Sequence, residues 1–323
     1  MLELDEIKRC YQRTITEGFV RRTPLFKHIQ QLVPGLSNTV HCKMESLQYE
    51  GSYKLRGVSN QMMDCDPNLT YTSMSAGNYG RAFARMLELK KGKGILFMPE
   101  TAPKERMEYI RSKGVPVETR KTSELEGAVQ DLVHTSNAVY LPSYDDRRLL
   151  AGYGGIALEI MEDYPEVDVV IVPCGGGGAL AGVAATFQLI KPSVRVFGVE
   201  PVNASTMYES LRKGEPQTLN RNNPPTIAAG LMPPNAGLIP FQIISKAVEE
   251  IVLVNEDEIR KAVLDLFKSG LKVEASGSVG IAALQSNKIP NLTKDSNVVV
   301  VCSGSNVTIR ELSKYENDAN ISL

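Results

Sequence analysis

Uninterrupted apolar runs occur at several places along the chain, and they predict buried strands. The three clearest runs cover residues 169–173, 194–199 and 297–302. Shorter runs begin at Thr70, Ile95 and Asn137. Hydrophobicity that is continuous instead of alternating is typical of strands covered on both faces, as they are in parallel sheets.

Segments with helical periodicity separate these strands. Asn255 and Glu258 form a capping box at the start of one such segment, and Gly270 supplies its stop. Another segment, residues 103–113, begins with proline and is followed by Gly114, the usual asymmetry of helix ends. The alternation predicts an α/β protein in which mostly parallel, twisted sheets are flanked by helices.

Composition and charge limit the partners that the protein can have. The 323 residues include 36 Lys or Arg and 37 Asp or Glu, so the formal net charge is −1 and no overall field favours nucleic acid or an anionic membrane. The chain has no apolar run of about 18 residues and no signal-peptide core, and its cysteines form no CxxC pair. We therefore expect a cytoplasmic protein whose partner is a small molecule, without nucleic acid or membrane.

Four consecutive glycines stand between the strand at 169–173 and an alanine-rich helical segment. They are Gly175, Gly176, Gly177 and Gly178. Without side chains, their backbone N–H groups can converge on an anion at the positive end of the following helix, so the loop predicts a phosphate site. No lysine closes a P-loop, and Leu180 stands where a GxGxxG motif has its third glycine, which argues against ATP and NAD.

Two further strand ends carry small polar residues. The segment SAGNYG begins at Ser75, after the strand at Thr70, and places Asn78 at the start of a helix. It would suit a carboxylate, although an ordinary serine or asparagine helix cap explains it equally well. The third loop follows the strand 297–302 and contains Ser303. Because ligands collect beyond the carboxyl ends of parallel strands, the three loops can open into one crevice.

Four segments together resemble a known family. SYKLRG at Ser52, SAGNYG at Ser75, CGGGGALAG at Cys174 and CSGSNV at Cys302 are similar to the signature segments of pyridoxal-phosphate enzymes with the tryptophan synthase β-subunit fold, or fold type II. Their order and spacing resemble the threonine and serine dehydratase and serine racemase branch. The resemblance implies a homodimer whose cofactor lies between a large domain, residues 1–67 with 144–323, and a small domain, residues 68–143.

The resemblance also implies a role for each motif residue. Lys54 would hold pyridoxal 5′-phosphate as a Schiff base. The residues that would contact this cofactor are Tyr53, Lys54, Asn78, Gly175, Gly176, Gly177, Gly178 and Ser303. Those that would hold the carboxylate of an amino-acid substrate are Ser75, Gly77, Asn78 and, through its amide, Tyr79.

These roles imply a reaction. A lysine amine released from the cofactor lies beside the α-carbon and can act as general base, while the cofactor takes up electrons. A neutral serine hydroxyl at the pyridine nitrogen, here Ser303, inclines such a site toward β-elimination. We therefore expect dehydration and deamination of L-threonine, L-serine or a related 3-hydroxy amino acid to a 2-keto acid and ammonia.

Several substitutions bear on the alternatives. The racemase motif carries a serine as proton donor where this chain has Ala76, which favours a lyase over a serine racemase. Tyr79 and Tyr153 replace a histidine and a glutamine, and we expect two phenols near the substrate to decide specificity, so a 3-hydroxyaspartate dehydratase stays open. A catalytically silent protein that binds the cofactor or a metabolite is the alternative from another class.

Glu200 is the one candidate metal ligand. The cation site of the family uses a glutamate at this position and an aspartate six residues later, where this chain has Thr206. The resemblance therefore argues against activation by a divalent metal.

Overall fold

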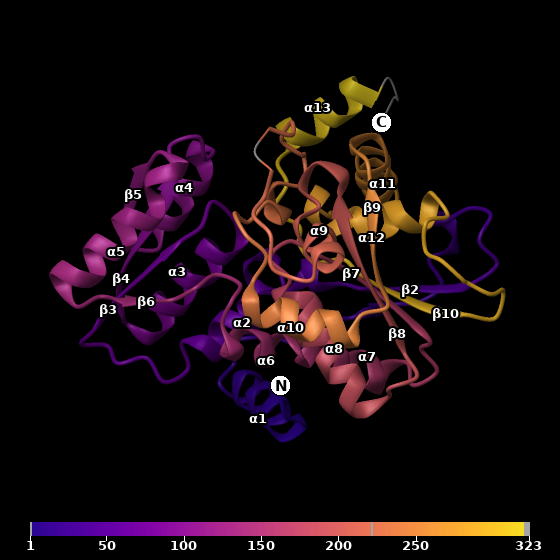
Figure 1. Ribbon diagram of the computed structural model, residues 1–323, viewed down its shortest axis with the longest axis horizontal. Helices are drawn as coiled ribbons and strands as arrows, with labels where there is room; N and C mark the ends of the chain where they lie inside the picture. The colour runs from indigo at the N-terminus through magenta and orange to yellow at the C-terminus, as the bar shows by residue number, and fades with distance from the viewer. Residues whose placement is uncertain (1, 221, 320–323) are drawn as a thin grey trace.

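The computed structural model of the chain describes residues 2–220 and 222–319. Figure 1 shows two lobes, each built around one sheet. The larger sheet consists, in spatial order, of β1 (Leu25–Phe26), β2 (Thr39–Lys43), β10 (Asn297–Val301), β7 (Val169–Pro173), β8 (Arg195–Pro201) and β9 (Glu250–Val254). The smaller sheet consists of β5 (Val117–Arg120), β4 (Lys93–Pro99), β3 (Thr70–Met74) and β6 (Val139–Tyr140). All neighbouring strands are parallel except β1, which is antiparallel to β2.

Helices cover both sheets, which confirms the predicted α/β fold. The α-helices of the described residues are α1 (Leu4–Thr16), α2 (Lys54–Gln61), α3 (Asn78–Lys90), α4 (Lys104–Ser112), α5 (Leu125–Ser136), α6 (Arg147–Tyr153), α7 (Gly155–Asp163), α8 (Gly178–Ile190), α9 (Thr206–Lys213), α10 (Leu238–Ala247), α11 (Glu256–Lys268), α12 (Ala275–Gln285) and α13 (Ile309–Ala319). Among them, none combines the length and the hydrophobicity needed to cross a membrane.

Both faces of the larger sheet are buried. Val170 and Val172 of β7 belong to the core that the sheet shares with α1, α2, α6, α7 and α8, whereas Val169 and Ile171 belong to the core under α11 and α12. Figure 1 shows these two groups of helices on opposite sides of the sheet. Because successive residues of a strand point to opposite faces, covering both faces explains why the strand is apolar throughout.

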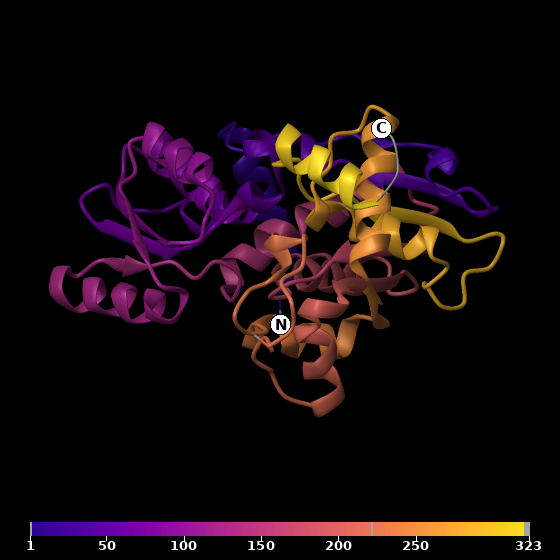
Figure 2. The same ribbon diagram turned by 90° about the horizontal axis from the view of Figure 1, so that it is seen from above.

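The smaller sheet is built in the same way. Phe97 of β4 packs with Leu125 and Val129 of α5 on one face, while its neighbour Leu96 belongs to the core that includes α3 and α4. Figure 2 shows α5 on one side of this sheet and the other helices of the lobe on the opposite side. All four strands of this sheet lie within residues 68–143, the range proposed for the small domain.

The predicted helix ends of α11 and α4 are confirmed. The side chain of Asn255 accepts the N–H of Glu258 at 2.9 Å, and the carboxylate of Glu258 accepts the N–H of Asn255 at 2.7 Å. Gly270 and Gly114 follow the two helices in the left-handed region, with φ of 78° and 79°. Four strands of the structure, β1, β2, β5 and β9, were not predicted from the sequence.

Four charged side chains lie buried between β2, α2 and α7. The carboxylate of Glu159 accepts hydrogen bonds from Lys43 Nζ at 2.6 Å and from both Nη atoms of Arg56 at 2.8 Å. Arg56 also donates from Nε and Nη2 to the two oxygens of Glu45, at 2.7 and 2.9 Å. Burial alone would raise the pKa of Glu159, but Arg56 and Lys43 hold it below its usual value. This network fixes α2, whose first residue is Lys54.

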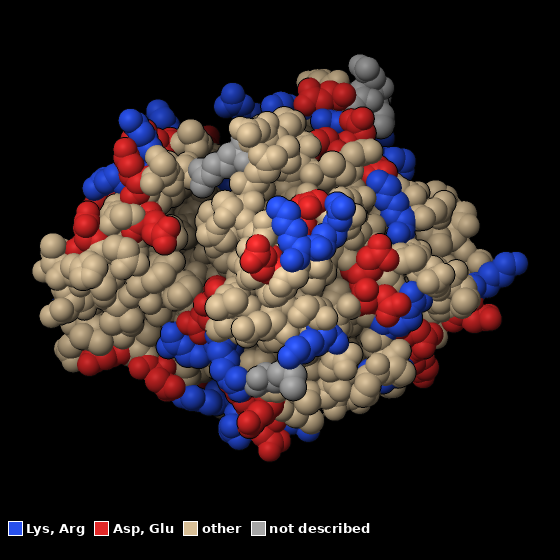
Figure 3. Space-filling view, viewed as in Figure 1, with Lys and Arg blue, Asp and Glu red and all other residues tan. Residues whose placement is uncertain are grey.

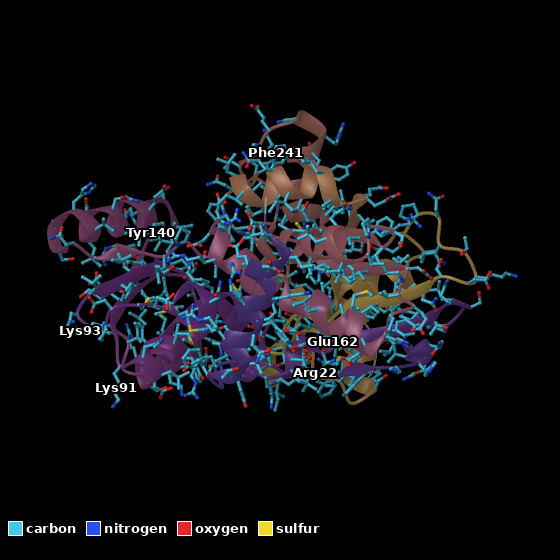
Figure 4. The ribbon with its side chains drawn as sticks, turned by 90° about the horizontal axis from the view of Figure 1, so that it is seen from below. Arg22, Lys91, Lys93, Tyr140, Glu162 and Phe241 are labelled. Carbon is cyan, nitrogen blue, oxygen red and sulfur yellow. The ribbon has the colours of Figure 1, made fainter. Side chains whose placement is uncertain are left out.

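Glu159→Ala is expected to lower the free energy of unfolding by about 3–5 kcal/mol, because it leaves the buried Lys43 amine without its carboxylate partner and Arg56 with Glu45 alone. The measurement is urea unfolding followed by circular dichroism. Glu162→Ala on the same helix is the matched control. Glu162 is 59% exposed and pairs with Arg22 at the surface (Figure 4), so its loss should cost about 1 kcal/mol or less. Equal losses in the two variants would contradict the role of the buried network.

Candidate active site

The segment that carries Lys54 is bound directly to the Ser303 loop. Ser52 forms an isolated antiparallel bridge with Gly304, and the N–H of Tyr53 donates to the carbonyl oxygen of Ser303 at 3.1 Å. Lys54 then opens α2. Two of the predicted motif segments, 250 residues apart in the chain, therefore lie side by side at the carboxyl edge of the larger sheet.

The Lys54 amine lies in a partly buried, aromatic environment. Its Nζ donates to the carbonyl oxygen of Ser143 at 3.2 Å and lies 5.3 Å from the ring centroid of Tyr53 and 6.0 Å from that of Tyr153. The two rings meet edge to face at a centroid distance of 4.9 Å. Burial lowers the pKa of Lys54 to about 8, because desolvation disfavours the ammonium form. A neutral amine is thus accessible near neutral pH.

The glycine loop connects β7 to α8 and leaves its N–H groups free. Gly177 has φ of 90°, a conformation that favours glycine. A Cβ on Gly176 would lie 2.4 Å from Cδ2 of Tyr144, so a side chain here would displace that ring. No hydrogen bond within residues 2–220 and 222–319 uses the N–H groups of Gly176, Gly177, Gly178 or Ala179. Unpartnered amides at a helix N-terminus form an anion cradle, as the sequence predicts.

The loop at Ser75 connects β3 to α3. The Ser75 hydroxyl oxygen accepts the N–H groups of Gly77 at 3.2 Å and Gly80 at 3.1 Å, so it caps the helix and keeps its own hydrogen to donate. Asn78, the first residue of α3, lies against the Ser303 loop, since a Cβ on Gly304 would lie 3.0 Å from Asn78 Nδ2. The Ser75 loop therefore meets the Ser303 loop, although it comes from the smaller sheet.

The phenol of Tyr79 lies in the core. Tyr79 is 2% exposed, and its hydroxyl donates to Oε1 of Gln61 at 2.7 Å. The hydroxyl thus faces a buried partner on α2, and the expectation that this ring lies near the substrate stays a prediction. Tyr153 does lie beside the Lys54 amine, but it is fully buried and its hydroxyl has no hydrogen-bond partner among the described residues.

Sequence reasoning missed three residues that the structure places at the site. Tyr144 lies against Gly176, Glu274 accepts a hydrogen bond from Asn78 Nδ2 at 2.6 Å, and Asn306 donates to Asn78 Oδ1 at 2.7 Å. Asn306 stands inside the CSGSNV motif, and this position could have indicated it as a site residue. Glu274 and Tyr144 stand outside the four motifs, and nothing in their local sequence marks them.

Glu200, the candidate metal ligand, caps a helix in the structure. Its two carboxylate oxygens accept the N–H groups of Met207 at 2.9 Å and Tyr208 at 2.8 Å, in the first turn of α9. Burial raises the pKa of this carboxyl to about 8. Within the part of the chain that the structure describes, no group of three or more His, Cys, Asp or Glu side chains is placed to hold a metal ion.

The chain is similar to known proteins over most of its length. A model of the family described as "Pyridoxal-phosphate dependent enzyme" matches residues 16–304. The chain belongs to this family. The L-threonine ammonia-lyase of Thermotoga maritima is 34% identical to it over 324 residues, which cover 98% of this chain and 79% of that protein. The predicted family is thereby confirmed.

Two solved structures of the same kind are similar over almost the whole chain. The serine racemase from Dictyostelium discoideum has a TM-score of 0.85 and 29% identity, and the match covers 95% of this chain and 99% of that chain. The processed form of threonine deaminase isoform 2 from Solanum lycopersicum has a TM-score of 0.88 and 27% identity, with 98% and 94% covered. The family implies pyridoxal phosphate as cofactor, and the free amides of the glycine loop and the Lys54 amine suit its phosphate and its aldehyde.

In the apo-protein, acylation of Lys54 by an amine reagent is expected to rise with pH around a midpoint of about 8, because only the neutral amine is nucleophilic. Brief exposure at a series of pH values, followed by mass spectrometry of the peptide that contains Lys54, measures this midpoint. Tyr53→Ala is the matched variant: it admits water to the amine, so the midpoint should move toward the ordinary 10.5. A midpoint above pH 10 in the parent protein would show that burial does not control the amine.

Proposed function

We propose that the protein is a pyridoxal-phosphate-dependent ammonia-lyase. It would remove the hydroxyl and amino groups of L-threonine, L-serine or a related 3-hydroxy amino acid and release a 2-keto acid and ammonia. The observation that carries this proposal is the Lys54 amine, which lies in a desolvated position beside the Ser303 loop. The name of the Thermotoga maritima relative, an L-threonine ammonia-lyase, supports the same reaction.

The cofactor would be held by residues of all four motifs. The N–H groups of the glycine loop would bind its phosphate, Lys54 would bind its aldehyde carbon and Tyr53 would pack near its ring. Asn78 would donate to the ring oxygen, and Ser303 would face the pyridine nitrogen. The full set is Tyr53, Lys54, Asn78, Gly175, Gly176, Gly177, Gly178 and Ser303.

Bound pyridoxal phosphate supplies a sink for electrons from the α-carbon of an amino acid. The Lys54 amine would accept the α-proton, a task for which a pKa near 8 suits it at neutral pH. Ser303 would offer the pyridine nitrogen a neutral hydroxyl, so the nitrogen need not carry a proton and loss of the β-hydroxyl is favoured. Serine would give pyruvate, and threonine would give 2-oxobutanoate.

The loop at the start of α3 would hold the carboxylate of the substrate. Ser75 keeps a hydroxyl hydrogen to donate, and the N-terminus of α3 presents the positive end of the helix. Gly77, Asn78 and the amide of Tyr79 would complete this site. The neighbouring Ala76 has only a methyl group and cannot protonate the α-carbon, so elimination would be favoured over racemisation.

The holoenzyme is expected to release 2-keto acid and ammonia from at least one member of a panel of L-serine, L-threonine and 3-hydroxyaspartate, because each carries a β-hydroxyl that can leave. Keto acid, ammonia and the stereochemistry of the remaining substrate are measured in the same samples. Lys54→Ala should abolish both release and the visible absorbance of bound cofactor.

Ala76→Ser is the informative second variant for that panel. It restores a hydroxyl on the face opposite Lys54, so the ratio of racemisation to elimination should rise. Stereochemical inversion without keto acid in the parent protein would identify a racemase instead. A visible cofactor band with no turnover of any substrate would identify a catalytically silent protein that binds the cofactor. If the protein did not bind the cofactor, neither the lyase nor the racemase could be correct.

We also propose that the protein works without a divalent cation, since α9 amides occupy both oxygens of Glu200. Addition of Mg²⁺, Mn²⁺ or EDTA should shift the melting temperature by less than about 1 °C, because a ligand stabilises a fold only by binding it. Thr206→Asp would place a second carboxylate beside Glu200 and should create a melting temperature that rises with added cation. A cation-dependent rise in the parent protein would contradict the proposal.

Three further features belong to the same proposal. A homodimer, which the family resemblance implies, is one of them, and exposed apolar side chains such as Leu47 (40%) and Tyr49 (44%) would be buried if they lay in its interface. All five cysteines are free, which suits the reducing cytoplasm.

The domain division belongs to the same proposal. All four strands of the smaller sheet lie within residues 68–143, which supports a small domain at 68–143 and a large domain made of residues 1–67 and 144–323.

A further inference from the structure

Glu274 contacts two of the motif loops, although it stands far from both in the sequence. It immediately precedes α12, and its Oε1 accepts a hydrogen bond from Asn78 Nδ2 at 2.6 Å. Its Oε2 accepts the backbone N–H of Asn306 at 3.0 Å. One carboxylate therefore links the loop of the smaller sheet to the loop that follows β10.

The orientation of the Asn78 amide follows from two independent constraints. Burial raises the pKa of Glu274, but in its ionised form the carboxylate can only accept, which requires Asn78 to turn its NH₂ group toward it. The carbonyl of Glu50 also can only accept, so the Asn306 atom 2.9 Å from it is the NH₂ nitrogen. That same nitrogen donates to Asn78 Oδ1 at 2.7 Å. Both constraints give one assignment of nitrogen and oxygen, which a single contact would leave open.

The network is packed tightly against the Ser303 loop. A Cβ on Gly304 would lie 2.6 Å from Glu274 Oε1 and 3.0 Å from Asn78 Nδ2. The backbone N–H of Glu274 also donates to the carbonyl of Gly304 at 2.9 Å. The Glu274 carboxylate and the Asn78 amide therefore both pack directly against the backbone of Gly304.

One N–H hydrogen of the Asn78 side chain has no partner among the described residues. Its NH₂ group has two hydrogens, Glu274 takes one, and no hydrogen bond of residues 2–220 and 222–319 uses the other. We propose that Glu274 is a positioning residue that holds Asn78 in the orientation that presents this second N–H to the anionic ring oxygen of the cofactor. The inference rests on the proposed function, in which Asn78 faces the cofactor.

Glu274→Gln tests this assignment with little change of shape. A glutamine has one acceptor oxygen for two incoming donors, the Asn78 NH₂ and the Asn306 backbone N–H. One of these two donors therefore loses its acceptor, and the Asn78 amide keeps only its contact with the Asn306 NH₂ as a constraint. The visible absorbance of the holoenzyme should then fall relative to its near-ultraviolet band. Binding of pyridoxal phosphate to the apo-protein should weaken about tenfold, the effect of losing one hydrogen bond to a charged group.

A double-mutant cycle separates this role from a general structural one. Glu274→Gln is introduced into the parent protein and into Asn78→Ala, and absorbance spectra and pyridoxal-phosphate titrations are recorded for all four proteins. The expected result is a spectral change and a tenfold loss in the parent, and neither in the Asn78→Ala background. Glu311→Gln is the matched control, because this carboxylate bonds Arg106 and not Asn78, and it should change neither readout.

Two outcomes of the cycle would overturn the inference: no effect of Glu274→Gln in the parent, or an equal effect in both backgrounds. If Glu274→Gln does not fold, Asn306→Ala replaces it in the cycle, because it removes the other constraint on Asn78 and should change the spectrum in the same direction. If Asn78→Ala itself changes neither readout, Asn78 does not face the cofactor and the inference falls. Keto-acid release from the parent protein then shows separately whether the proposed reaction stands.

Discussion

The position of Lys54 depends on a buried network of two positive and two negative side chains. Arg56 lies in the first half of α2, two residues after Lys54. It donates hydrogen bonds to Glu45 and Glu159. Lys43 of β2 completes the set through Glu159. Desolvating four charges is costly, and only a complete set of partners offsets the cost. A helix held by such a set cannot rotate or slide without separating buried charges, so the residue at its N-terminus is held as firmly as the core.

The phosphate cradle depends on a different constraint, the absence of side chains. Tyr144, Met207 and Pro240 close over the glycine loop so tightly that a Cβ on Gly176 or Gly177 would lie within 2.8 Å of one of them. Contacts with residues of the 142–146 turn, α9 and α10 therefore restrict these loop positions to glycine. On the face seen in Figure 3, acidic and basic side chains are interspersed. In the proposed site, backbone amides would supply the attraction for the phosphate.

The sequence predicts those parts of the fold in which local pattern and tertiary environment agree. β7 is apolar throughout and is covered on both faces, so its bounds were predicted correctly. β2 was missed because Lys43 and His41 interrupt its apolar pattern, and Lys43 is buried only because Glu159, 116 residues later, compensates its charge. The same limit applies to the site. Motif spacing identifies Lys54 and the three loops, but the inward turn of Tyr79 requires Gln61, a partner on another helix.

The chemistry proposed for Lys54 places two opposing demands on one amine. It must be neutral to bind the cofactor, yet basic enough to accept a proton from the substrate. A fully solvated lysine meets only the second demand, and a deeply buried one meets only the first. The fall of its pKa from 10.5 to about 8 increases the neutral fraction at pH 7 by a few hundredfold, to about a tenth. The rings of Tyr53 and Tyr153 provide this intermediate environment, because they exclude water from one side of the amine without offering it a counter-charge. A carboxylate at the same place would restore the high pKa, so two aromatic rings beside the lysine serve the proposed reaction better than an ion pair would.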